Sequence, residues 1–224
     1  TTGGFIALPV CYAAFLLRIS IDLHELNVEF GKASRQLVRV AEKIYVVFEK
    51  TKNLLPGYKN VFITSYPIRF KNKLFVKDKI VQCVNNDNKS IKIGQLDNQK
   101  QTIFLLGGSQ GSVSLNNLFK EGIENDLKFY QNIQIIHQTG MTNFYWWRTF
   151  YQHKNISAVI FSYTHEIEKF YNLADLVITR AGAGTLFELL FFEKKSIIIP
   201  LKTKVTSHQY QNALAMQKKN PRLF

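Results

Sequence analysis

A small-residue turn at 181–184 (Ala-Gly-Ala-Gly) is the strongest candidate for a ligand-binding site in this sequence. It lies between an apolar strand pattern and an apolar helix pattern. A strand that passes through such a turn into a helix directs free backbone N–H groups and the positive end of the helix dipole at one point. A phosphate fits there. Glu188 follows one helical turn later, where its carboxylate can accept hydrogen bonds from a sugar hydroxyl. The pattern therefore predicts half of a nucleotide-sugar site.

A second glycine turn, at residues 107–111, also follows an apolar strand pattern and precedes a helix pattern. Its glycines let the backbone approach a ligand closely, and Ser109 can donate a hydrogen bond to a phosphate oxygen. The turn lacks the Lys-Ser/Thr pair of a Walker loop and the spacing of the Gly-x-Gly-x-x-Gly dinucleotide motif. Taken alone, it is either a phosphate-binding turn or an ordinary connection between a strand and a helix.

Other polar groups also follow predicted strands, where open α/β sheets bind their ligands. Residues 24–27 (His-Glu-Leu-Asn) either face a ligand or cap a helix, and no second histidine completes the His-Glu-x-x-His zinc pattern. At residues 137–140 (His-Gln-Thr-Gly) we expect a structural histidine. The amides of residues 208–213 either recognise sugar hydroxyls or face water, and the aromatic stretch 144–151 either packs in the core or contacts a base or a membrane.

The composition limits the class of protein. A chain of 224 residues, 46% of them hydrophobic, can build one large packed domain or two small ones. Cys11 and Cys83 lie far apart, which argues against a disulfide framework or a zinc site and favours a reducing compartment. The formal net charge of +13 is typical of proteins that meet nucleic acid, an anionic membrane surface or a phosphorylated ligand.

Strand and helix patterns alternate along the chain and predict an α/β fold with parallel sheets covered on both faces. The expected strands are 19–23, 43–48, 61–64, 102–106, 133–137, 156–161, 176–179 and 196–200. The expected helices are 9–17, 32–41, 111–127, 165–172, 185–192 and 207–219. Residues 70–100 are rich in Lys, Asn and Asp and lack clear periodicity, so we expect an inter-domain connection there and a boundary near Ile68.

Taken in order, these motifs resemble the MurG family over nearly the whole chain. Gly-Gly-Phe at 3–5, His-Glu-Leu-Asn at 24–27 and Gly-Lys-Ala-Ser-Arg at 31–35 are similar to the family's Gly-Gly-Tyr, His-Glu-Gln-Asn and Gly-Lys-Ala-Asn-Arg. Ser-Tyr-Pro-Ile-Arg at 65–69 stands where Gly-Asn-Pro-Val-Arg is usual. The turn at 107–111, His-Gln-Thr-Gly at 137–140, Arg-Ala-Gly-Ala at 180–183, and Gln209 with Asn212-Ala213 complete a series of eight motifs in the family's order.

The resemblance implies a GT-B fold, with two Rossmann-like parallel-sheet domains, a cleft between them, and the first domain incomplete. It implies an acceptor and membrane-side domain at 1–68 and a UDP-sugar donor domain at 69–224, truncated at its end. The implied donor-binding residues are Arg69, Ser109, Thr164, Ala183, Gly184, Thr185, Glu188, His208 and Gln209, and the implied acceptor-side residues are Glu25 and Asn27.

The resemblance also implies a role for each donor residue. Arg69 and the backbone around Thr164 lie near the uracil, Glu188 binds the ribose hydroxyls, and Ser109 binds a phosphate. Residues 183–185 approach the diphosphate and the sugar, and Gln209 with His208 contacts the N-acetylglucosamine.

Family members move N-acetylglucosamine from UDP-N-acetylglucosamine to the C4 hydroxyl of undecaprenyl-linked muramyl-pentapeptide (lipid I), which forms lipid II for peptidoglycan and so supports cell-wall synthesis, cell shape and division. The resemblance implies this inverting hexosyltransferase reaction, with helix N-termini stabilising the leaving diphosphate and with no metal or other cofactor. It also implies peripheral binding to the anionic inner leaflet, at the cytoplasmic face of the bacterial inner membrane, and no nucleic-acid partner.

The family's first strand leads into a Gly-x-Gly-Gly-His loop whose histidine is the candidate general base, and no such segment precedes Thr1. We therefore expect the catalytic base upstream of Thr1, and a fragment that binds the UDP-sugar but turns over poorly or not at all. Three alternatives stay open: a related glycolipid glycosyltransferase with the same donor site, a degenerate homologue without catalysis, and a basic nucleic-acid-binding module with salt-dependent affinity.

Overall fold

The chain folds into two compact α/β units in a computed structural model, which describes residues 1–71, 80–84, 90–97, 99–108, 110–141, 143–201 and 208–224. Unit 1 comprises Thr1–Ile68, Ala181–Phe187 and Pro200–Lys219. Unit 2 comprises Arg69–Arg180, Glu188–Ile199 and Asn220–Phe224. The division into consecutive domains at 1–68 and 69–224 stays a prediction, because unit 1 also includes two segments from the C-terminal part of the chain.

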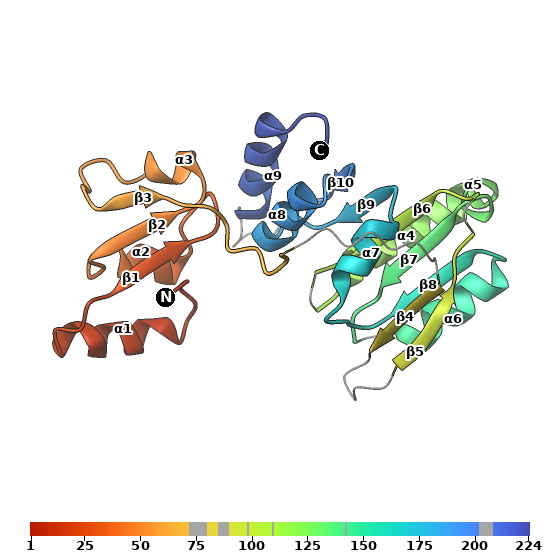
Figure 1. The fold of residues 1–224 in the computed structure, drawn as a ribbon, viewed down its shortest axis with the longest axis horizontal. Coiled ribbons are helices and arrows are strands. Elements are labelled where there is room, and N and C mark those ends of the chain that lie inside the picture. The colour runs from red at the N-terminus through yellow and green to blue at the C-terminus, as the bar shows by residue number, and fades with distance from the viewer. Residues whose placement is uncertain (72–79, 85–89, 98, 109, 142, 202–207) are drawn as a thin grey trace. The chain divides into compact units, whose positions relative to one another are not determined.

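Unit 1 contains a three-stranded parallel sheet in the order β1-β2-β3 (Figure 1). Its strands are β1 (Asp22–Glu25), β2 (Lys43–Val46) and β3 (Val61–Ile63). Its helices are α1 (Ala7–Leu16), α2 (Lys32–Leu37), α3 (Glu49–Lys52), α9 (His208–Lys219) and the first residues of α8 (Ala183–Phe191). Leu23 and Ile44 are fully buried and join Leu37 of α2 in the core.

The two faces of the unit 1 sheet differ because side chains alternate along a strand. In β1, Leu23 and Glu25 are buried, whereas His24 points to the opposite face and stacks on Tyr45 of β2 with ring centroids 4.6 Å apart. The expected strand at 19–23 in fact begins at Asp22 and ends at Glu25. Glu25 is therefore a buried residue at the end of a strand rather than part of a loop.

Unit 2 contains a five-stranded parallel sheet in the order β10-β9-β6-β7-β8. Its strands are β6 (Thr102–Leu106), β7 (Gln134–Gln138), β8 (Ser157–Phe161), β9 (Leu176–Thr179) and β10 (Ser196–Ile198). Its helices are α4 (Val113–Asn125), α5 (Leu127–Gln131), α6 (Phe144–His153), α7 (Ile167–Leu173) and the last residues of α8. The predicted α/β fold with parallel sheets is confirmed, and all eight expected strands occur.

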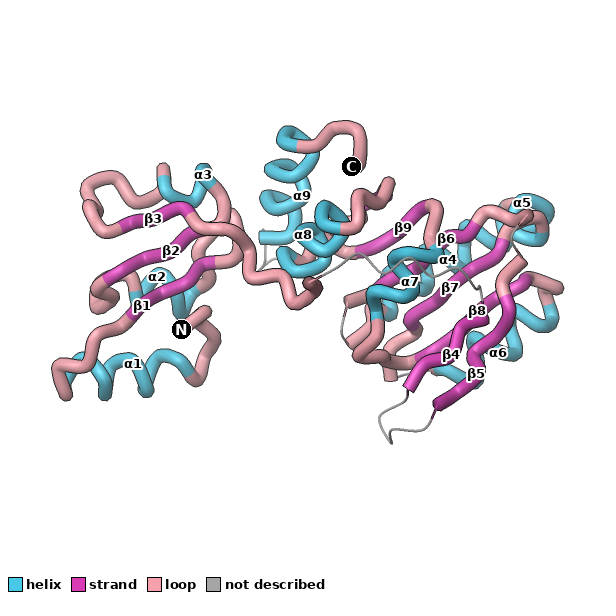
Figure 2. The backbone as a smooth tube through the Cα atoms, in the orientation of Figure 1, coloured by secondary structure: helices cyan, strands magenta, loops and turns pink. Residues whose placement is uncertain are grey.

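Strand β6 lies between β9 and β7 in the sheet (Figure 2). It is buried along its whole length, which explains its apolar sequence from Ile103 to Leu106. Phe104 contacts Phe170 and Tyr171 of α7 on one face of the sheet. Leu105 and its neighbour Ile103 belong to the core cluster on the other face, with residues of α4 and α6. The strand that precedes the glycine turn is therefore packed on both faces by helices.

Three stretches of the chain, two in unit 2 and one in unit 1, bear on the expectations. The aromatic stretch at 144–151 forms most of helix α6, in which Trp147, Phe150 and Tyr151 are buried, so its packing role is confirmed for these residues. The stretch expected as an inter-domain connection contains an antiparallel hairpin of β4 (Ile80–Val84) and β5 (Ser90–Gln95). Helix α2 ends at Leu37 rather than at residue 41, because the N–H groups of Arg39 and Val40 donate to carbonyls three residues back, those of Gln36 and Leu37, as in turns.

Candidate functional site

The small-residue turn at 181–184 occupies the junction between β9 and α8. The strand ends at Thr179, whose Oγ1 donates to the carbonyl of Leu106 at 2.7 Å, and α8 begins at Ala183. The first N–H groups of an α-helix have no intrahelical partner, so those of Ala183, Gly184 and Thr185 lie at the positive end of the dipole without an acceptor inside α8. The helix has no acidic residue in its first turn that would compete with a bound anion.

Gly184 also allows a close contact within unit 1. A Cβ atom at this position would lie 2.9 Å from the hydroxyl of Tyr66, and the Tyr66 ring stacks on Phe187 with centroids 4.7 Å apart. The absence of a side chain at Gly184 therefore leaves room for Tyr66 beside the helix start.

Glu188 lies on α8, one turn beyond this helix start, and both of its carboxylate oxygens are oriented. The hydroxyl of Tyr171 donates to Oε2 at 2.9 Å, and Arg69 Nε lies 3.6 Å from Oε1. Burial raises the pKa of Glu188, while the Tyr171 hydrogen bond and the Arg69 charge pull that pKa down. The result is an oriented, partly desolvated carboxylate that can accept hydrogen bonds from hydroxyl groups. The structure thus places Arg69 beside Glu188, a pairing that sequence reasoning did not expect.

Glu25 and Asn27 meet in unit 1, where they form a network with Asn212 of α9. Glu25 Oε1 accepts hydrogen bonds from the backbone N–H and from Nδ2 of Asn27, at 3.0 and 3.1 Å. Asn212 Nδ2 donates to Asn27 Oδ1 at 3.0 Å, and Asn212 Oδ1 accepts from the N–H of Val28 at 2.9 Å. Glu25 Oε2 is buried and has no hydrogen-bond partner among the described residues. An oriented carboxylate oxygen with a free lone pair can accept a hydroxyl hydrogen from a ligand.

Asn212 was missed as a site residue, although its side chain is fully buried and connects α9 to the loop after β1. The only sequence signal was its place in the Gln209 and Asn212-Ala213 motif. A polar side chain on the inner face of a helix is the pattern that could have identified it, since buried polar groups need partners.

His208 and Gln209 lie in the first turn of α9. Gln209 Oε1 accepts a hydrogen bond from the N–H of Leu201 at 2.8 Å, which orients the amide. His208 Nδ1 is buried without a hydrogen-bond partner in the described part of the chain. Both side chains therefore keep polar atoms that a ligand can engage.

Ser109 lies outside the described residues. The turn around it shows the close backbone packing expected from its glycines, because a Cβ atom on Gly107 would lie 2.4 Å from the N of Ser112. Thr164 is buried, and its Oγ1 accepts from the N–H of Glu166 at 3.1 Å, so this side chain supports the start of α7. Any contact of that segment with a base would come from its backbone.

Arg180 is a further residue that sequence reasoning named only within a motif. Its Nε donates to Ser112 Oγ at 3.0 Å, its Nη1 to the carbonyl of Ile199 at 3.1 Å, and its Nη2 to Ser114 Oγ at 2.5 Å. Burial lowers the pKa of its guanidinium. Arg180 therefore ties the end of β9 to the start of α4 and to the segment after β10.

His137 is the structural histidine that its position predicts. It is fully buried in β7, with Nδ1 3.0 Å from the hydroxyl of Tyr151 and Nε2 3.2 Å from Asn116 Oδ1. Burial lowers the pKa of its imidazole to about 3, so the ring is neutral at physiological pH.

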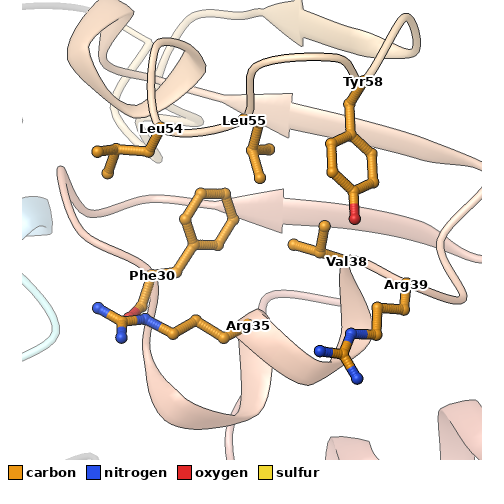
Figure 3. A pocket seen from close by; sticks show the side chains of 7 residues that line it. All are labelled: Phe30, Arg35, Val38, Arg39, Leu54, Leu55 and Tyr58. Carbon is orange, nitrogen blue, oxygen red and sulfur yellow. The ribbon is translucent and has the colours of Figure 1, made fainter.

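A separate cavity of about 380 Å³ lies in unit 1 between α2 and the loop before β3 (Figure 3). It is lined by Phe30, Arg35, Val38, Arg39, Leu54, Leu55 and Tyr58. None of the predicted site residues lines it. Across the part of the chain that the structure describes, no three His, Cys, Asp or Glu side chains are grouped to hold a metal ion. No described helix has the length and apolarity needed to cross a membrane.

Comparison with known proteins adds to this geometry. Residues 102–223 match the family model described as the glycosyltransferase family 28 C-terminal domain. Two curated relatives carry the name UDP-N-acetylglucosamine--N-acetylmuramyl-(pentapeptide) pyrophosphoryl-undecaprenol N-acetylglucosamine transferase. The relative from Thermodesulfovibrio yellowstonii is 33% identical over 94% of this chain and 55% of its own length. The relative from Pelagibacter ubique is 34% identical over 95% of this chain and 55% of its own length.

Solved structures show the same fold. The crystal structure of Acinetobacter baumannii MurG is 25% identical, with a TM-score of 0.66 over 98% of this chain and 57% of that chain. A UDP-GlcNAc 2-epimerase from Neisseria meningitidis, solved with UDP-GlcNAc, is 9% identical with a TM-score of 0.58, over 99% of this chain and 68% of that chain, and shows likeness of fold alone. The chain spans about half the length of the curated relatives it matches.

Proposed function

Because the chain belongs to glycosyltransferase family 28, we propose that it forms part of an inverting hexosyltransferase that moves N-acetylglucosamine from UDP-N-acetylglucosamine to the C4 hydroxyl of undecaprenyl-linked muramyl-pentapeptide. The product of this reaction is lipid II. The observation that carries the proposal is the start of α8, where N–H donors without an intrahelical acceptor precede an oriented Glu188 carboxylate by one helical turn.

In the proposed donor site, the start of α8 binds the diphosphate and the next helical turn binds the ribose. The N–H groups of residues 183–185 hold the diphosphate, and they stabilise the negative charge that develops on it as the bond to the sugar breaks. Glu188 accepts hydrogen bonds from the ribose hydroxyls. Tyr171 and Arg69 orient this carboxylate before the nucleotide binds, which reduces the ordering cost of binding.

The remaining predicted residues complete the proposal. Ser109 binds a phosphate, the backbone at Thr164 and the side chain of Arg69 flank the uracil, and Gln209 with His208 contacts the N-acetylglucosamine. Residues 69–224 form the donor domain in this assignment.

The acceptor side is assigned to residues 1–68, with Glu25 and Asn27 as its polar contacts. The buried Oε2 of Glu25, which has no partner among the described residues, supports this assignment because it can accept a hydroxyl hydrogen. Asn27 orients that carboxylate directly by donating to Oε1, and Asn212 in turn orients the Asn27 side chain.

We also propose that the protein binds peripherally to an anionic membrane, at the cytoplasmic face of the bacterial inner membrane. Support comes from the net charge of +13 and from a group of exposed apolar side chains on and beside α1. This α1 apolar surface consists of Phe5, Ile6, Val10, Phe15, Leu16, Leu17 and Ile19.

A nucleotide-sugar titration tests the donor site. Calorimetry should show binding of UDP-N-acetylglucosamine in preference to UDP-glucose and UDP-galactose. The Glu188→Ala variant should weaken the affinity for UDP by about tenfold or more, since a hydrogen bond to a charged group contributes about 1.5–3 kcal/mol.

Glu124→Ala is the matched control, because Glu124 is an exposed carboxylate on α4 paired only to Lys120 among the described residues. It should leave the affinity unchanged. Equal UDP affinity in Glu188→Ala and the unaltered protein would show that Glu188 is not the ribose partner.

A further inference from the structure

We propose that His137 is a positioning residue: a directed chain of hydrogen bonds from Tyr151 through His137 and Asn116 to the Thr139 carbonyl fixes the glycine turn after β6 in its nucleotide-binding conformation. This inference rests on the proposed function, because it assigns the turn to the UDP-sugar. All of its residues belong to unit 2.

The direction of each hydrogen bond follows from the last one. The carbonyl of Thr139 can only accept, so the group of Asn116 that lies 3.1 Å from it must be the donating Nδ2. The other amide atom, Oδ1, then faces His137 Nε2 at 3.2 Å and accepts a hydrogen from it. The hydrogen of the neutral imidazole therefore resides on Nε2, which leaves Nδ1 as an acceptor.

The hydroxyl of Tyr151 completes the chain by donating to His137 Nδ1 at 3.0 Å. Tyr151 is 1% exposed and His137 is 0% exposed, so water does not compete for these atoms. The T-shaped contact of the imidazole with Trp147, at 4.6 Å between centroids, further restricts the ring. One tautomer and one ring orientation satisfy every polar atom in the chain of contacts.

The Thr139 carbonyl matters because the backbone next to it packs directly on the glycine turn. A Cβ atom on Gly111 would lie 2.6 Å from the Cα of Gly140 and 2.7 Å from the Thr139 carbonyl oxygen. A Cβ atom on Gly140 would lie 2.4 Å from the carbonyl oxygen of Gln110. With no side chain between the two backbones, a displaced Thr139 carbonyl displaces the turn.

Asn116 also fixes the turn from its other end. It lies on the buried face of α4, next to Leu115, whose N–H donates to the N-cap side chain of Ser112 at 3.3 Å. The N–H of Gly111 donates to the Gly108 carbonyl at 3.0 Å and closes the turn. Asn116 is thus the point at which α4, the turn and the segment after β7 are held together.

Three variants test this chain of hydrogen bonds. Asn116→Asp keeps the acceptor for His137 but replaces the donor to Thr139 with an oxygen. Tyr151→Phe removes only the hydroxyl that donates to Nδ1. Thr102→Val is the matched control, because it removes a buried acceptor of Gln134 Nε2 at the opposite end of β6.

Three measurements are made on each variant: the affinity for UDP, the exchange rate of the Gly111 amide, and the ¹⁵N shifts of the His137 ring. The unaltered protein should show the Nε2–H tautomer. Asn116→Asp should weaken UDP binding and speed Gly111 exchange by about tenfold or more, and Tyr151→Phe should do so by about threefold. Thr102→Val should lower the midpoint of unfolding without changing the UDP affinity or the Gly111 exchange.

An Nδ1–H tautomer would overturn the proposal, and so would equal effects of Asn116→Asp and Thr102→Val on UDP affinity and on Gly111 exchange. Failure of the unaltered protein to bind UDP would contradict the proposed function instead. In that case the ring ¹⁵N shifts and the Gly111 exchange still decide whether the chain of hydrogen bonds holds the turn.

Discussion

Glu188 and His137 show how the same physical effect prepares two residues for different tasks. Burial disfavours the charged form of each, so it raises the pKa of Glu188 and lowers that of His137. For Glu188, the hydrogen bond from Tyr171 and the charge of Arg69 oppose the effect of burial on the pKa, and they orient the carboxylate. The hydrogen-bond partners of His137 among the described residues, Asn116 and Tyr151, are neutral, and His137 stays neutral, which suits a residue that orients its neighbours.

The depressed pKa of His137 predicts how stability depends on pH. Between about 3, its value in the folded protein, and 6.5, its ordinary value, the unfolded chain binds one more proton than the folded chain. The contribution of His137 to stability is therefore complete above pH 6.5 and falls by about 1.4 kcal/mol per pH unit below it.

Denaturant unfolding of the protein and of His137→Gln checks this prediction. The difference in unfolding free energy between the two should change by about 2 kcal/mol from pH 7.5 to pH 5, with the histidine protein losing more stability. The same difference at both pH values would contradict a neutral, buried His137.

At the scale of elements, the strand ends of unit 2 carry the candidate site because three connections converge on them. Arg180 links the end of β9 to Ser112 before α4 and to the Ile199 carbonyl after β10. The turn after β6 and the segment after β7 pack backbone on backbone through Gly111 and Gly140. Such contacts leave the glycine turn little freedom, which suits a site that must bind a diphosphate without reorganising.

Gly140→Ala and Gly108→Ala separate backbone strain from crowding in the same unit. Both glycines have positive φ, at +79° and +86°, so either alanine costs about 1–2 kcal/mol of strain. The new Cβ at position 108 meets nothing within 4 Å, whereas at position 140 it meets the Gln110 carbonyl oxygen at 2.4 Å.

We therefore expect Gly140→Ala to lower the unfolding free energy by about 1–3 kcal/mol more than Gly108→Ala, because overpacking typically costs that amount. Unfolding in urea provides the measurement. Equal losses of unfolding free energy in the two variants would mean that the segment after β7 can move away from the turn to accommodate the new Cβ atom at little cost.

For the molecule as a whole, the proposed membrane binding rests on two properties, the net charge of +13 and the α1 apolar surface. In this proposal the positive charge attracts anionic headgroups, and the apolar side chains insert between them. Binding should therefore require anionic lipid, and it should weaken as the salt concentration rises.

Vesicle co-sedimentation tests this prediction with the double variant Leu16→Ser/Leu17→Ser, whose side chains are 80% and 72% exposed. Partial burial of two leucines contributes about 1–3 kcal/mol, so we expect about tenfold weaker binding to anionic vesicles. Tyr145→Ser, at an 80% exposed residue of unit 2, is the control and should bind as the unaltered protein does. An equal loss in both variants would argue against the α1 apolar surface as the contact.

The sequence by itself predicted the fold class and the eight strands of the two parallel sheets, but not the β4–β5 hairpin or helices α3, α5 and α6. Strand periodicity and glycine turns are local properties, so β6 and β9 followed directly from them, and a helix was expected two residues after the observed start of α8. Glu188 followed for the same reason, because one helical turn separates it from the small-residue turn.

The pairings that orient those residues became visible only in the folded chain. Asn212 reaches Asn27 across 185 positions, and Arg69 reaches Glu188 through the fold rather than through any spacing. Hydrogen bonds and ion pairs depend on distance and direction in space, to within a few tenths of an ångström, and a linear pattern carries neither. The sequence could therefore name the carboxylate of the site, whereas its partners and the protonation states of buried groups required the folded chain.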